Sequence, residues 1–176
     1  MSWILTASGR KVDLLAPEPE SIVIDDIAHA LAHVCRFAGH TKRYYSVAQH
    51  SVLCSYQVPK NFAFAALMHD AAEAYLGDVA APLKGLLPEY QAIEERFERV
   101  LYAKFGLDYP KSPYVKHVDM VALATERRDL MPPDDEVWPC LRGVRPLARR
   151  IYALPPAKAK EMFIKRFNEL AKGDWG

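Results

Sequence analysis

The residues best suited to chemistry are four ionisable side chains that begin with an adjacent His–Asp pair. His69 and Asp70 are consecutive, Glu73 follows His69 by about one helical turn, and Asp78 comes directly after Gly77. Histidine and aspartate are ligands that suit zinc, manganese, iron or cobalt. They end an apolar stretch, where polar groups without partners are costly. We therefore predict a divalent-metal site at His69 and Asp70.

A metal held by two adjacent residues needs further ligands from neighbouring helices. Adjacent helical residues point about 100° apart, so a metal at the helix edge can still take one bond from each. His50, early in its own predicted helix, is a candidate for the third ligand. Asp119 is a candidate for the fourth, because a carboxylate among valines in mid-helix needs a partner.

Two acids beyond the His–Asp pair have the spacing of a proton-transfer pair. Glu73 shares a helical face with His69 and would lean toward water beside the metal, as general base or acid. Asp78 could hold that water or protonate the leaving oxygen. Each residue alone also fits a helix cap or a surface position, and His33 competes with His50 on residue type. The argument for chemistry depends on the ordered set.

Helical periodicity dominates the chain and predicts one all-α domain over residues 1–176. Residues 1–24 are expected to be extended, with a small β-hairpin around Ser8-Gly9. Residues 25–131 form the core that holds the metal site, and residues 132–176 form a Pro/Arg-rich loop and a C-terminal helix. Caps, prolines and glycines predict helices over residues 25–39, 46–58, 59–77, 88–106, 112–131 and 155–172.

Composition narrows the classes of function. The net charge of +1 argues against extended nucleic-acid binding, which needs a strongly basic face. No apolar run reaches the roughly 20 residues needed to cross a bilayer, and the N-terminus lacks the features of a signal peptide. Three scattered cysteines predict neither disulfides nor a thiolate zinc site. We expect a cytoplasmic protein that makes no membrane contact.

The ordered set resembles the HD-domain phosphohydrolases, and within them the YfbR-like 5′-deoxynucleotidases. The similarity covers roughly residues 25–130, and its motifs are Tyr45–His50, Ala66–Asp78 with a Gly-Asp-x-x-x-Pro-x-Lys tail, and Val115–Asp119. It implies an HD-domain helical bundle with one divalent ion, Co, Mn, Zn or Fe. The ligands that it implies are His50, His69, Asp70 and Asp119. The catalytic residues that it implies are Glu73 and Asp78.

The resemblance also implies a set of substrate-binding residues. An arginine followed by an aromatic residue contacts phosphate and nucleoside in that family, and Arg36-Phe37 stands here, fourteen residues before His50. Phenylalanine replaces the tryptophan of the relatives, and the spacing differs by one residue. Lys84 and Lys116 match basic positions near the site and are expected to bind phosphate.

Three functions follow as hypotheses. The first is hydrolysis of a (deoxy)nucleoside 5′-monophosphate to nucleoside and phosphate. The second is a dNTP triphosphohydrolase, such as a dATP triphosphohydrolase, as in some phage relatives, with the arginines of residues 134–150 holding the longer phosphate chain. The third is a non-catalytic nucleotide-binding HD module, which would not need Glu73 and Asp78. Relatives assemble, so we expect a homodimer or higher homo-oligomer; the apolar face of the last helix is either its interface or part of the core.

Overall fold

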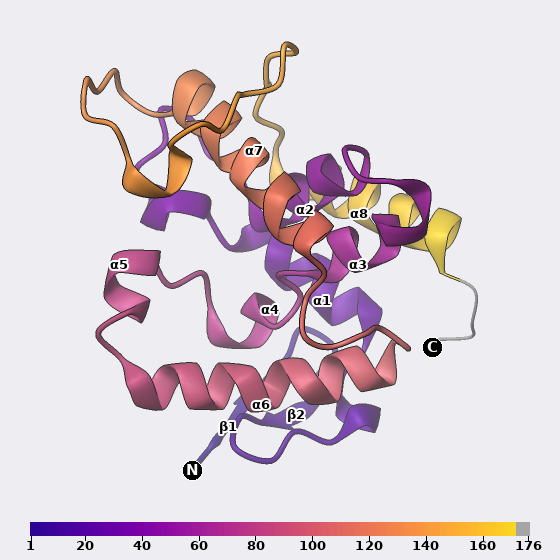
Figure 1. Cartoon of the computed structure of the whole chain (residues 1–176). Helices are drawn as coiled ribbons and strands as arrows, with labels where there is room; N and C mark the ends of the chain where they lie inside the picture. The colour runs from indigo at the N-terminus through magenta and orange to yellow at the C-terminus, as the bar shows by residue number, and fades with distance from the viewer. Residues whose placement is uncertain (172–176) are drawn as a thin grey trace.

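The computed structural model describes residues 1–171 and is mostly helical, with a small two-stranded antiparallel sheet (Figure 1). Its strands are β1 (Trp3–Leu5) and β2 (Lys11–Asp13). Its α-helices are α1 (Ile24–His33), α2 (Val47–Ser55), α3 (Ala63–Met68), α4 (Glu73–Leu76), α5 (Ala81–Lys84), α6 (Pro88–Lys104), α7 (Pro113–Leu130) and α8 (Pro156–Leu170). Four short 3-10 turns, η1 (Pro19–Ser21), η2 (Arg36–Gly39), η3 (Lys60–Phe62) and η4 (Pro139–Leu141), lie between them.

The N-terminal hairpin is confirmed and is fastened to the first helix. β1 and β2 pair antiparallel, with Trp3 opposite Asp13, and the connecting turn uses the positive φ of Gly9. The backbone N–H and the hydroxyl of Ser8 donate to the Asp26 carboxylate of α1 at 2.8 and 2.7 Å. Since Val12 is fully buried, the hairpin contributes to the core, and the fold is more than the all-α domain that periodicity predicts.

The core lies where α1, α2, α3 and α8 pack together. Ile27 and Leu31 of α1 are fully buried, and Phe163 and Phe167 of α8 pack into the same cluster. The apolar face of the last helix therefore closes the domain's own core and is not an exposed interface. The predicted end of that helix near residue 172 lies outside the described residues; within them α8 ends at Leu170.

The predicted N-terminal cap of α2 is confirmed, and the Gln49 side chain has a separate role. The Ser46 hydroxyl accepts from the backbone N–H of Gln49 at 3.2 Å. The Gln49 side chain turns away and holds the chain before α8, donating to the Tyr152 carbonyl at 2.7 Å and accepting from Leu154 N–H at 2.9 Å. The helix ends at Ser55, three residues before the predicted end at residue 58.

The single central helix predicted over residues 59–77 is wrong, because the structure divides it at the His–Asp pair. α3 ends at Met68 and α4 begins at Glu73. Between them the backbone bonds run to the third preceding residue, Ala71 to Met68 and Glu73 to Asp70, both at 3.0 Å. This 3-10 geometry tightens the turn, so His69 and Asp70 stand on a turn between two helices.

α7 presents the remaining acids of the site on one face. It is capped by Ser112, whose hydroxyl accepts from Tyr114 N–H at 3.3 Å, and Pro113 occupies its first turn. Asp119 and Glu126 are seven residues apart, which is two turns, so both face the same side. The loop over residues 132–155 is held against the end of this helix, where the Asp129 carboxylate accepts from Ile151 N–H at 2.8 Å. Within residues 1–171, no helix is long and apolar enough to span a membrane.

Candidate metal centre

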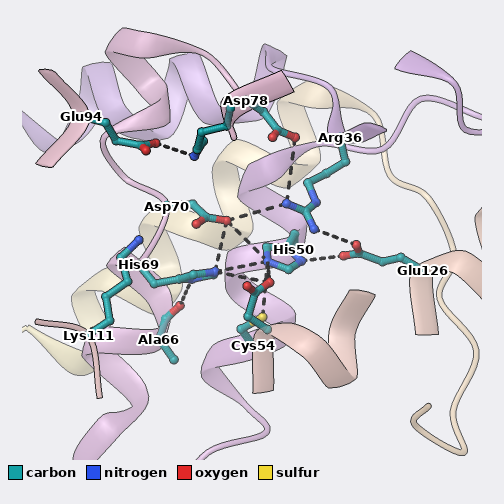
Figure 2. Close-up of polar contacts among 12 residues, drawn as sticks. Arg36, His50, Cys54, Ala66, His69, Asp70, Asp78, Glu94, Lys111 and Glu126 are labelled. Carbon is teal, nitrogen blue, oxygen red and sulfur yellow. Dashed lines mark hydrogen bonds and ion pairs between the residues drawn. The ribbon is translucent and has the colours of Figure 1, made fainter. Parts of the chain in front are cut away.

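Two buried imidazoles point toward each other at the centre of the helical core (Figure 2). Nδ1–H of His50 donates to the Glu126 carboxylate at 2.6 Å, and Nδ1–H of His69 donates to the Ala66 carbonyl at 2.8 Å. Both acceptors lack a proton to give, so each ring must carry hydrogen on Nδ1. The two Nε2 atoms, 3.3 Å apart, are thereby left to face the same point.

Two carboxylates complete this point, one from the residue next to His69 and one from α7. Asp70 Oδ2 lies 3.1 Å from Nε2 of His69 and 3.5 Å from Nε2 of His50. Asp119 Oδ1, on α7, lies 3.2 Å from Nε2 of His50 and 3.9 Å from Nε2 of His69. The structure therefore brings together all four residues that the sequence singles out as ligands. The Asp119 side chain is 29% exposed, so this side of the cluster is open to solvent.

The four donor atoms have the spacing and chemistry of a divalent-metal site. A zinc-type ion with nitrogen and oxygen ligands at about 2.0–2.2 Å places tetrahedral ligands about 3.3–3.6 Å apart. The five separations that involve an imidazole Nε2, 3.1–3.9 Å, include that range. Neutral rings and ionised carboxylates offer only lone pairs to one another, so the arrangement favours either ring protons or a bound cation between them. One divalent ion meets this need better than two ring protons 3.3 Å apart.

The pKa values of the two histidines and two aspartates also favour positive charge at this point. Burial opposes charge on His69, but the neighbouring Asp70 and Asp119 outweigh burial and raise its pKa to about 10. Burial likewise opposes charge on His50, yet the nearby acidic groups hold its pKa well above the ordinary value. Burial would raise the pKa of Asp70 and of Asp119, but the two imidazoles lower both. The carboxylates therefore favour positive charge between the two imidazoles.

Glu126 is a site residue that the sequence analysis missed. It is fully buried and bridges two groups, accepting from His50 Nδ1–H at 2.6 Å and from an Arg36 Nη2–H at 3.1 Å. Burial disfavours its ionised form, but Arg36 and His50 outweigh burial and hold its pKa at about 2. Its sequence context, Thr-Glu-Arg-Arg, is typical of a solvated helix face. The signal that could have found it is its position two turns after Asp119.

Arg36 lies beside the cluster with part of its guanidinium unpaired. Nη1 is 3.9 Å from both Asp70 and Asp78, beyond hydrogen-bonding distance, and the buried Nε makes no hydrogen bond. Burial disfavours its charge, but Glu126, Asp70 and Asp78 hold its pKa well above the ordinary value. A charged, buried donor with free N–H groups is suited to an anion such as phosphate.

The backbone after Arg36 is strained. The predicted helix over residues 25–39 is wrong in its second half: α1 ends at His33, and η2 follows with φ of 55° at Phe37 and 49° at Ala38. Such φ values are uncommon outside glycine and cluster at functional sites. They turn the Phe37 ring toward Trp138 of the 132–155 loop, with ring centroids 6.3 Å apart.

Glu73 and Asp78 occupy the same neighbourhood with different surroundings. Burial, with Asp70 and Asp78 nearby, raises the pKa of Glu73 well above its usual range, and its Oε2 has no hydrogen-bond partner. Burial also raises the pKa of Asp78, although Arg36 counters part of this effect. Gly77, with φ of 81°, makes the turn that brings Asp78 back to the site, and that conformation favours glycine.

The two lysines that we predicted to bind phosphate, Lys84 and Lys116, have different surroundings from each other. Lys84 donates to Glu94 at 2.6 Å, so its charge is already paired, although it lies close enough to affect the pKa of Glu73 and Asp78. Lys116 is exposed on α7, one turn before Asp119, and no ion pair involves it in the described part of the chain. The structure thus brings neither lysine into direct contact with the four ligands.

A cysteine also lies against the two imidazoles. The Cys54 thiol, on α2, is 3.6 Å from Nε2 of His50 and fully buried. His50, Cys54 and His69 form a buried group that could hold a metal ion, with donor atoms within 4.8 Å of one another. The two imidazoles could therefore bind a metal together with the two carboxylates, or together with the Cys54 sulfur. We favour the carboxylates as the primary ligands, because burial does not prevent their ionisation and Asp119 is open to solvent.

Comparison with known proteins places the chain in a family. No family model matches it. It is 49% identical over 174 residues to an uncharacterized Escherichia coli protein, YfdR, covering 98% of this chain and 97% of that one. It is 32% identical over 191 residues to an uncharacterized Rhodobacter capsulatus protein, covering 97% and 96%. The chain belongs to the family of YfdR. Neither relative's name states an activity.

Proposed function

We propose that this chain is a metal-dependent phosphohydrolase with an HD-domain helical bundle, acting on nucleotide phosphate esters. The preferred substrate class is a (deoxy)nucleoside 5′-monophosphate. One observation carries the proposal: four metal-type donor atoms converge beside a buried arginine whose Nε and Nη1 lack close partners. A cation-binding centre next to an arginine that can bind an anion suits phosphate-ester hydrolysis.

The donor set favours one divalent cation held by His50, His69, Asp70 and Asp119. When bound there, such an ion polarises a phosphoryl oxygen and acidifies water. Glu126 keeps the His50 ring in the tautomer that directs Nε2 inward. The Ala66 carbonyl does the same for His69.

Arg36 is the group that holds the substrate phosphate. Its free N–H groups face the acids of the site, and a phosphate oxygen would satisfy them with charge-assisted hydrogen bonds. Glu126 holds the other edge of the guanidinium at 3.1 Å and so fixes its plane. Phe37 lies out of helical geometry beside this arginine, and in this proposal its ring contacts the nucleoside.

Glu73 and Asp78 are the groups that move protons. One takes the proton of the attacking water, and the other gives a proton to the leaving oxygen. The pKa of Glu73 is raised more strongly than that of Asp78, mainly by burial, and this favours Glu73 as the proton donor. Arg36 supports the ionised form of Asp78, which favours that residue as the acceptor.

Product identification tests this function. Metal-free protein reloaded with Co²⁺ or Mn²⁺ is incubated with all four dNMPs and dNTPs, and the products are resolved by ion-exchange chromatography. Orthophosphate and nucleoside from monophosphates, lost in Glu73→Gln, are the expected result. Tripolyphosphate from a dNTP would instead identify a triphosphohydrolase. Nucleotide binding without turnover, unchanged in Glu73→Gln, would identify a binding module and overturn the proposal.

A further inference from the structure

The thiol of Cys54 has a neighbourhood that ordinary core packing does not require. A buried cysteine usually behaves as a small apolar side chain. Cys54 does touch an apolar cluster, with Ala66 of α3 and Val118 and Ala122 of α7. Its sulfur, however, faces the Nε2 atom of His50 at 3.6 Å.

The spacing on α2 explains why the sulfur reaches the cluster. Cys54 follows His50 by four residues, so the two side chains lie on one face, one turn apart. With a zinc–sulfur bond of about 2.3 Å and a zinc–nitrogen bond of about 2.1 Å, tetrahedral sulfur and nitrogen ligands lie about 3.6 Å apart. The observed separation of 3.6 Å, which a thiol–imidazole hydrogen bond also allows, equals the separation expected of two such ligands. Figure 2 shows Cys54 beneath His50, close to the point at which the imidazoles meet.

We propose that Cys54 is an additional ligand of the metal, making this a mixed nitrogen, oxygen and sulfur site. On binding, the S–H bond breaks, its electron pair becomes the metal–sulfur bond, and the proton leaves to solvent. Sulfur is a soft ligand, so the site selects Zn²⁺, Co²⁺ or Fe²⁺ over Mn²⁺ and Mg²⁺. This inference rests on the proposed metal site, but it does not depend on which ester is hydrolysed.

Optical titration of metal-free protein with Co²⁺ tests the sulfur bond directly. A near-ultraviolet sulfur-to-cobalt charge-transfer band is expected at one equivalent, together with visible d–d bands. Cys54→Ser should lose the charge-transfer band and keep the d–d bands, and Cys140→Ser, which alters an exposed cysteine, should keep both. Cys54→Ala serves as a second variant, with circular dichroism as the check on folding.

Competition between metals gives an independent measurement. Cys54→Ser should lose roughly tenfold or more in Zn²⁺ affinity while Mn²⁺ affinity changes little. Visible d–d bands without the charge-transfer band in the wild-type protein would overturn the sulfur ligand and leave the phosphohydrolase proposal standing. Absence of any Co²⁺ binding would overturn both. A charge-transfer band without phosphate release from any nucleotide would support the ligand and overturn only the function.

Discussion

Glu126 Oε1 lies 2.6 Å from Nδ1 of His50, and the other oxygen of the same carboxylate lies 3.1 Å from Arg36. One buried acid therefore fixes both a metal ligand and the proposed phosphate-binding side chain. The cation centre and the anion centre of the site share a support, so a change in this carboxylate should affect both.

Glu126→Gln tests that shared support. The amide cannot accept two charge-assisted bonds as the carboxylate does, so metal affinity should fall about 10–100-fold and KM should rise. Isothermal titration with Zn²⁺ and steady-state kinetics measure the two effects. Glu89→Gln, an exposed acid in the first turn of α6, is the control and should change neither. Metal affinity unchanged in Glu126→Gln would remove Glu126 from the site.

Replacing one carboxylate ligand should abolish metal binding while the protein still folds. Asp70→Asn keeps the shape of the side chain but loses the charge between the two imidazoles. We expect loss of metal and of turnover together, and a thermal midpoint that no longer responds to added metal. In the wild type, metal at about 100 times Kd should add about 2.7 kcal/mol of stability. A variant that still retains metal would refute this ligand assignment.

Arg36→Ala should weaken binding of the phosphate group. The variant removes the free N–H groups beside Asp70 and Asp78, so KM should rise about tenfold or more. Inorganic phosphate should also become a poorer competitive inhibitor. Arg99→Ala, which removes an exposed arginine of α6, should leave both constants unchanged. If KM were the same in the two variants, Arg36 would not contact substrate.

The raised pKa of Glu73 predicts how the folding stability of the protein changes with pH. A carboxyl whose folded-state pKa exceeds its unfolded value holds its proton in the folded state, so stability falls as pH rises between the two values. Glu73→Gln removes this penalty. In metal-free protein it should be more stable than wild type by about 1 kcal/mol near pH 8, and the difference should vanish near pH 4. Urea unfolding at both pH values provides the measurement. A variant less stable than wild type at pH 8 would contradict a raised pKa for this buried acid.

Local signals in the sequence predict much of the fold. Ser46 and Ser112 both act as helix caps, and Gly9 makes the hairpin turn. The break between α3 and α4 was not predictable, because the apolar pattern continues across it. Only the side-chain bond from His69 to the Ala66 carbonyl and the 3-10 turn show why the helix divides there.

The sequence predicts the four proposed ligands of the candidate site. It predicts less well the residues that hold those ligands in position. His50, His69, Asp70 and Asp119 come together from α2, α7 and the turn between α3 and α4, as their types and order predict. Arg36 was identified through resemblance alone, since nothing near it in the sequence indicates its partners. Glu126 was missed because its local context is charged. Its burial is a tertiary effect of α7 packing against α2.

Phosphate release as a function of metal content tests the central claim most directly. Metal-free protein receives Co²⁺ in steps, and release of orthophosphate from a deoxynucleoside monophosphate is followed at each step. Release should rise linearly, break at one equivalent per chain and disappear on chelation, with Asp70→Asn inactive throughout. Release that is unaffected by chelation, or absent from every nucleotide at full occupancy, would contradict a metal-dependent phosphohydrolase.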